Sequence, residues 1–141
     1  MASALQRLRW DRPQPAKRKR IRALVSAESI IALGGLCLVL GTQEEIEVVG
    51  TAADGVELLE KAVSLQPDLI VSEVSIPRLD GLACASCLRY LMPGVRIILL
   101  TGSNGNVSLD ECLRSGADAC LKRAQIPEGL LSEIRSLFPT S

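Results

Sequence analysis

The sequence predicts an α/β fold in which five parallel strands form one doubly wound sheet with helices on both faces. Short apolar runs alternate with stretches of helical period over residues 21–138, and turn residues such as Pro67-Asp68 and Pro93-Gly94 separate them. Because crossovers between parallel strands are right-handed, the strand order 2-1-3-4-5 is favoured. The apolar fraction of 48% is enough for a core, and only 2% of residues are aromatic, so aliphatic side chains must fill it.

The first half of the predicted domain contains two strand–helix units. Strands are expected at residues 21–25 and 46–49, and helices at about 28–41 and 55–65. Aliphatic and β-branched residues dominate both strands, as their propensities require. Gly50 is expected to close the second strand, and the side chain of Asp54 suits an N-cap of the second helix.

The second half repeats this alternation. Strands are expected at 69–72, 95–100 and 119–121, and helices at about 82–91, 109–115 and 127–137. Pro93-Gly94 should stop the third helix, and Gly116 should end the fourth. Either Asn106 or Ser108 can cap the start of the fourth helix, and Pro127 suits the first turn of the last.

The third strand and the turn after it form the centre of the sequence. The strand should end near Glu73, whose side chain would then stand at the carboxyl edge of the sheet, where open α/β sheets place their sites. Residues 76–81 follow as a turn: Pro77 fixes φ, and Asp80-Gly81 tolerates left-handed backbone before a helix begins. We therefore expect the functional site around Glu73.

Charge divides the chain into a basic arm, residues 1–20, and an acidic domain, residues 21–141. The arm holds seven Lys/Arg and one Asp, a net charge of about +6, which leaves about −6 on the domain. The cluster Lys17, Arg18, Lys19 and Arg20 suits contact with nucleic acid, acidic lipid or an acidic protein. The simpler interpretation, which we favour, is a flexible and solvated arm.

The sequence shows no membrane span and no secretion signal. The longest apolar run, residues 30–40, is too short to cross a bilayer. Five cysteines, an odd number, favour reduced thiols and a cytoplasmic location. Cys84 and Cys87 form a C-x-x-C pattern inside a predicted helix, so we expect small packing residues with Cys84 toward the core, not a redox pair.

The strand and turn at 69–81 resemble the receiver domains of response regulators in two-component signalling, in particular the LuxR/NarL-type subfamily. Further stretches match at similar spacing: Ile46-Glu47-Val48-Val49-Gly50, Ala53-Asp54-Gly55, Leu99-Leu100-Thr101 and Gly116-Ala117-Asp118-Ala119. Together they extend over nearly all of residues 21–138. The resemblance implies the flavodoxin-like (CheY-like) fold, which agrees with the strand order above, and a signalling role rather than an enzymatic one.

The resemblance also implies a phosphorylation pocket, from which this chain departs. Receivers hold Mg²⁺ with two acidic residues after the first strand and a phosphoacceptor Asp, and they contact the phosphoryl group through a Thr or Ser and a Lys. The equivalent positions here are Ala27-Glu28 for the acidic pair, Glu73 for the acceptor, Thr101 for the hydroxyl, Arg123 for the lysine and Cys120 for an aromatic residue of the fifth strand. One carboxylate, the acceptor type, the lysine and the aromatic ring are therefore changed.

These departures predict a single-domain pseudo-receiver that is not phosphorylated, needs no cofactor and acts through protein–protein contacts. Glu73 reaches one methylene further than Asp, and a misplacement of about an ångström can cost about 10²-fold in rate. A charge-assisted and bidentate ion pair of Glu73 with Arg123 is expected instead. One alternative is phosphorylation of Glu73, with Glu28 and Glu73 as weak Mg²⁺ ligands; the other is nucleic-acid binding through the arm.

The first helix is apolar on every side over residues 30–40. At about 100° per residue, Ala32, Leu36, Val39 and Leu40 should face the sheet. A helix that is apolar all round is expected to be buried all round, so the outer side predicts a protein partner or a second copy of the chain. The residues predicted for that contact are Ile30, Leu33, Cys37 and Leu38, beside Gly34. The alternative is that the arm folds back over this side.

Overall fold

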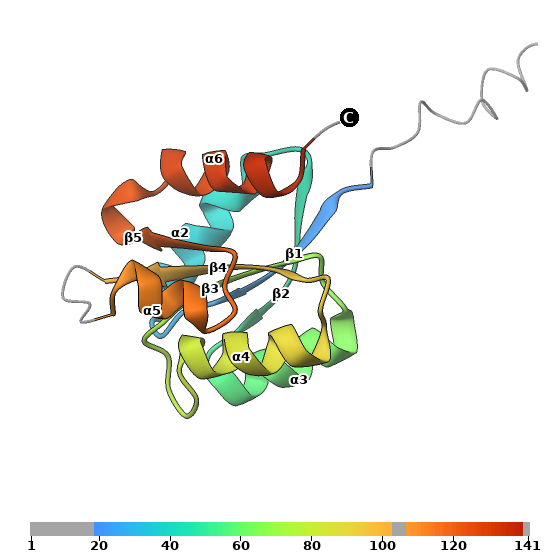
Figure 1. The fold of residues 1–141 in the computed structure, drawn as a ribbon. Helices are drawn as coiled ribbons and strands as arrows, with labels where there is room; N and C mark the ends of the chain where they lie inside the picture. The colour runs from blue at the N-terminus through green and yellow to red at the C-terminus, as the bar shows by residue number, and fades with distance from the viewer. Residues whose placement is uncertain (1–18, 103–106, 140–141) are drawn as a thin grey trace, which may run out of the picture.

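A single parallel sheet organises the computed structural model, which describes residues 19–102 and 107–139 (Figure 1). Its strands are β1 (Ile21–Ser26), β2 (Ile46–Ala52), β3 (Leu69–Glu73), β4 (Arg96–Thr101) and β5 (Ala119–Lys122). They lie in the order β2-β1-β3-β4-β5, and every pairing is parallel. The predicted fold class and strand order are therefore confirmed.

Helices cover both faces of the sheet. They are α2 (Ile30–Gly41), α3 (Gly55–Leu65), α4 (Gly81–Leu91), α5 (Leu109–Arg114) and α6 (Glu128–Leu137), with a 3₁₀ turn η1 (Arg123–Gln125) after β5. Figure 1 shows α2 and α6 on one side of the sheet and α3 and α4 on the other. Two core clusters match this division, one under α2 and α6 and one under α3, α4 and α5.

Side-chain caps set the helix starts. Asp54 accepts a hydrogen bond from the backbone N–H of Glu57 and Ser108 from that of Glu111, so both predicted N-caps are confirmed, while Asn106 lies outside the described residues. Ser29 caps α2 by accepting from Ala32 N–H, and the helix therefore begins at Ile30 rather than near Glu28.

Strand β2 runs three residues further than predicted, to Ala52. It stays paired with β1 up to Ser26 opposite Ala52, across a register shift between Ala23 and Leu24. Gly50 thus lies inside the strand and does not close it, because a parallel partner continues to bond the backbone there. A Cβ at Gly50 would come within 2.8 Å of the Leu65 side chain, so close packing explains the glycine.

The central strand carries the candidate site to the sheet edge. All five residues of β3 are buried, with Ile70 in one core cluster and Leu69 and Val71 in the other. Full burial of each such side chain stabilises the fold by about 1.5–3 kcal/mol. The strand ends at Glu73, as expected, and it includes this residue beyond the predicted range 69–72 because Glu73 still pairs with Leu100 of β4.

The turn after β3 is fixed by close backbone contacts. Asp80 caps α4 through Ala83 N–H, and the left-handed residue is Arg78 (φ 69°), not Asp80 or Gly81 as the sequence suggested. Gly55 N–H donates to the carbonyl of Pro77 at 3.0 Å, and a Cβ at Gly55 would collide with the backbone of Leu79. The start of α3 therefore holds this turn in place.

Helix α2 leaves a large apolar surface exposed. Ile30, Ile31 and Leu38 are 88%, 89% and 74% exposed. Leu33 and Cys37 were predicted to face outward but are half-buried against the core. Leu36 and Leu40 pack onto the sheet, and this orientation of the helix leaves Ile31 on the side that faces solvent. The exposed residues therefore differ from the predicted contact residues. We call them the exposed α2 face, which consists of Ile30, Ile31, Gly34, Gly35 and Leu38. In the described part of the chain, no helix combines the length and apolarity needed to cross a membrane.

Candidate functional site

The candidate site centres on a buried carboxylate at the end of β3. Glu73 is only 5% exposed. Its Oε2 accepts a charge-assisted hydrogen bond from the Arg123 guanidinium, and its Oε1 accepts from the backbone N–H of Glu28 at 2.9 Å. The predicted Glu73–Arg123 ion pair is therefore confirmed, but it is not bidentate as predicted: Arg123 bonds Oε2 alone, because the backbone N–H of Glu28 occupies Oε1.

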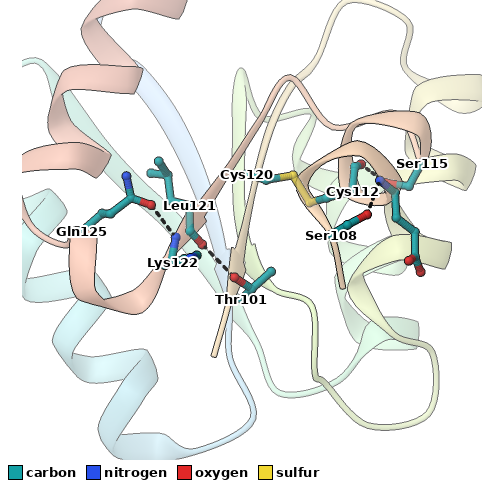
Figure 2. The surroundings of a disulfide bond; sticks show 9 residues. Thr101, Ser108, Cys112, Ser115, Cys120, Leu121, Lys122 and Gln125 are labelled. Carbon is teal, nitrogen blue, oxygen red and sulfur yellow. Dashed lines mark hydrogen bonds between the residues drawn. A yellow bond between two sulfur atoms is a disulfide. The ribbon is translucent and has the colours of Figure 1, made fainter. Parts of the chain in front are cut away.

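Sheet topology brings these residues together although they are far apart in sequence. Glu73 ends β3, Thr101 ends β4 and Arg123 follows β5 directly, and these three strands are neighbours in the sheet. Carboxyl ends of parallel strands meet at one edge, which is why residues 50 positions apart can form an ion pair. The hydroxyl of Thr101 donates to the carbonyl of Leu121 at 3.4 Å, across to β5 (Figure 2).

The predicted acidic pair supplies no side-chain carboxylate to the ion pair. Ala27 is buried, with a methyl group where a carboxylate was expected from the resemblance. Glu28 has an exposed side chain and contributes its backbone N–H instead. Sequence reasoning missed this backbone contact, because no side-chain pattern reports it.

The arrangement does not fit a Mg²⁺ ion. Mg²⁺ requires near-octahedral oxygen ligands and usually one or two free carboxylates. Here a guanidinium occupies one oxygen of Glu73 and an N–H the other. Within residues 19–102 and 107–139, no group of three or more His, Cys, Asp or Glu side chains is arranged to hold a metal.

We therefore expect Mg²⁺ to bind with a dissociation constant weaker than about a millimolar. Titration calorimetry of the whole chain measures this directly. The matched variant Ala27→Asp with Glu73→Asp returns both carboxylates and should bind more tightly than the wild type. Submillimolar binding to the wild type would show that Arg123 yields its place to the ion.

Cys120 lies apart from the ion pair. It packs partly with the cluster under α3, α4 and α5, whereas Leu121 packs with the cluster on the opposite face. It forms a disulfide with Cys112 of α5 (Figure 2). The prediction of reduced thiols is wrong for this pair, because the fold places a helix residue against a strand residue that local spacing does not join. Cys84 is buried, as predicted, and is free like Cys37 and Cys87.

A groove of about 490 Å³ opens beside the ion pair. Ile31, Gly35 and Val39 of α2 line one part of it, and Ile126 and Pro127, between η1 and α6, line another. Glu73 and Arg123 also reach its surface. No local sequence pattern predicts this groove, because its lining residues come from opposite ends of the domain.

The basic arm falls mostly outside the described residues. Lys17 and Arg18 are not among them, whereas Lys19 and Arg20 are exposed. Arg20 donates to the carbonyls of Glu44 at 3.0 Å and Ile46 at 2.9 Å. The last residue of the predicted arm is thus hydrogen-bonded to the start of β2.

The fold, together with a carboxylate at the end of β3 beside a hydroxyl and a cation on the next two strands, defines a receiver-type domain. A model of the response regulator receiver domain family matches residues 28–135. The chain therefore belongs to the response regulator receiver domain family.

Two curated relatives are transcription or oxygen regulators by name. Oxygen regulatory protein NreC of Staphylococcus carnosus is 29% identical over 119 residues, which are 84% of this chain and 55% of NreC. The uncharacterized transcriptional regulatory protein YxjL of Bacillus subtilis is 28% identical over 117 residues, 83% of this chain and 54% of YxjL. The chain spans about half the length of these relatives.

Solved structures share the fold. The response regulator domain of Thermotoga maritima CheB aligns with a TM-score of 0.77 at 28% identity, covering 86% of this chain and 98% of that one. The signal receiver domain of NarL from Mycobacterium tuberculosis aligns with a TM-score of 0.78 at 21% identity, covering 86% and 99%, and supports the fold alone.

Proposed function

We propose that this chain is a pseudo-receiver of two-component or phosphorelay signalling: it is not phosphorylated at Glu73, it catalyses no reaction, and it acts through protein–protein contacts. The observation that carries this proposal is the occupied carboxylate of Glu73, held by Arg123 and by the backbone N–H of Glu28. Both oxygens that could attack a phosphoryl donor already accept hydrogen bonds.

Phosphoryl transfer needs an in-line nucleophile and cations that offset the charge of the transferred group. The candidate nucleophile here is a glutamate whose charge is neutralised by Arg123, the cation at the expected lysine position. Releasing it would leave a carboxylate that is 5% exposed without its ionic partner, at a cost of about 1–3 kcal/mol before any chemistry. The ion pair therefore favours one fixed state over a phosphorylation switch.

The exposed α2 face supports a role in binding another protein. Ile31 and Leu38 are more than two-thirds exposed on a helix that carries no charged residue. An apolar patch of this kind on a folded domain is typical of an interaction surface. We propose that a protein partner or a second copy of the chain covers it.

Nucleic-acid binding through the basic arm and a cytoplasmic location are two further predictions. The basic cluster Lys17, Arg18, Lys19 and Arg20 keeps nucleic-acid binding as the alternative function, since electrostatic contact with phosphates requires such a cluster. A cytoplasmic location fits a signalling domain of this family and is proposed on that ground.

The proposed function predicts no phosphoryl adduct after incubation with acetyl phosphate and Mg²⁺, measured as intact mass. The matched control is the combined variant Ala27→Asp, Glu73→Asp and Arg123→Lys, which restores the residue types of the family at three positions. An adduct on the control but not on the wild type supports the proposal. An adduct on the wild type that Glu73→Gln removes would establish the alternative, phosphorylation at Glu73.

A further inference from the structure

The disulfide between Cys112 and Cys120 ties a short helix to the edge of the sheet (Figure 2). Cys112 belongs to α5 and Cys120 to β5, their Cα atoms are 6.3 Å apart, and eight positions separate them in sequence. Strand β5 is the last strand of the sheet order, so this bond lies at an open edge. The bond therefore adds a covalent link between the middle of α5 and the edge strand.

Within the described residues, the other contacts that hold α5 lie mainly at its C-terminal end, where Ser86 and Arg89 of α4 donate hydrogen bonds to the carbonyls of Ser115 and Gly116. Helix α5 is six residues long, and within these residues Cys112 is the buried side chain. Leu109 and Leu113 are exposed at 60% and 43%. The caps Ser108 and Ser115 bond within the helix itself, to Glu111 N–H and to the carbonyl of Cys112. A helix this short is marginal without tertiary contacts, so its anchor decides its order.

We propose that Cys112 and Cys120 form a reversible redox-modification site, in which making and breaking their disulfide sets how firmly α5 is held against β5. The oxidised form fixes α5 to the edge strand. The reduced form keeps Cys112 only as a small buried side chain, and α5 opens more readily from the sheet.

A peroxide is the oxidant that forms this disulfide, and an external thiol is the reductant that breaks it. A peroxide converts one cysteine thiolate to a sulfenic acid with loss of hydroxide or alkoxide, and the second thiol displaces water to form the disulfide. In reduction, an external thiolate attacks the sulfur of Cys120, and Cys112 leaves as thiolate. A second external thiol then displaces Cys120 and completes the two-electron step. Attack at Cys120 is favoured because it is half-buried, whereas Cys112 is fully buried.

The other close cysteines of the chain provide an internal control. Cys84 and Cys87 lie on the same helix, α4, and are free thiols. Burial raises the pKa of the Cys84 thiol to about 12, so it stays protonated at neutral pH and is a poor nucleophile. Cys84 is also placed to donate to the carbonyl of Gly55 at 3.4 Å. Cys87 is exposed, but its neighbour Cys84 is a protonated, buried thiol, so we do not expect the two to form a redox pair.

Trypsin distinguishes these cysteines in the whole chain. Cleavage at Arg114 separates Cys112 from Cys120, so their disulfide appears as peptides 97–114 and 115–122 joined together. Cys84 and Cys87 share peptide 79–89, and Cys37 lies in 23–61. After treatment with hydrogen peroxide and blocking of free thiols, we expect the joined peptides, and dithiothreitol should separate them. Absence of the joined peptides after peroxide would overturn the proposal.

Hydrogen exchange tests the effect on α5. Reduction of the wild type should speed amide exchange of residues 109–115 by about tenfold or more, with little change in β3. It should lower the melting temperature by roughly 5–10 °C, from the loss of a short closed loop. Cys120→Ser should show the reduced behaviour under both conditions, and Cys87→Ser should switch like the wild type. If the oxidised and reduced forms of the wild type show the same amide exchange in α5, the proposal is overturned. This comparison needs no variant.

Discussion

Arg123→Ala is expected to lower the free energy of unfolding by about 1–3 kcal/mol, measured by urea denaturation. The variant leaves Glu73 with the backbone N–H of Glu28, while its carboxylate stays 5% exposed. Breaking a fully buried ion pair costs about 3–5 kcal/mol. Because the Arg123 side chain is 62% exposed, solvent screening weakens the ion pair, and the loss of unfolding free energy should be below that of a fully buried pair.

A neighbouring cation provides the control for this loss. Lys122 is exposed and its backbone, not its side chain, makes the hydrogen bond to Gln125. Lys122→Ala should therefore change stability by less than about 0.5 kcal/mol. A double-mutant cycle of Arg123→Ala with Glu73→Gln isolates the interaction itself. Zero coupling in that cycle would mean that the ion pair does not hold the site in one state.

Replacing Ile31 and Leu38 by Glu together should abolish partner binding or self-association while leaving the fold intact. Both side chains are largely exposed, so the free energy of unfolding should change by no more than about 0.5 kcal/mol for each. A buried apolar contact, in contrast, would not tolerate two charges. Sedimentation measures the assembly state, and affinity capture from the native cell extract measures the partner.

A matched substitution elsewhere distinguishes this surface from general effects of charge. Val63 on α3 is also exposed and apolar, so Val63→Glu should keep both the assembly state and the partner. A double variant of Ile31 and Leu38 that retains both would remove α2 from the proposed function. A double variant that instead loses several kcal/mol of stability would indicate that the chain's own residues 1–18 cover the exposed α2 face.

Local patterns were sufficient to predict the fold and the position of the candidate carboxylate. Turn residues and apolar runs located every strand, and right-handed crossovers then fixed the order of the sheet. Glu73 and Arg123 were predicted to pair because both follow strands whose carboxyl ends meet at one edge. Asp54 and Ser108 were predictable as caps because capping acts within one helical turn.

Tertiary packing decided what local patterns left open. Helix α2 is apolar on every side, so its sequence has no period that chooses an outward face; the packing of Leu36 and Leu40 on the sheet exposes Ile31 and half-buries Leu33 and Cys37. The Cys112–Cys120 bond depends on how α5 lies against β5, and the Glu28 contact to Glu73 uses backbone alone. These features arise from segments brought together in space, where side-chain identity alone does not specify distance or direction.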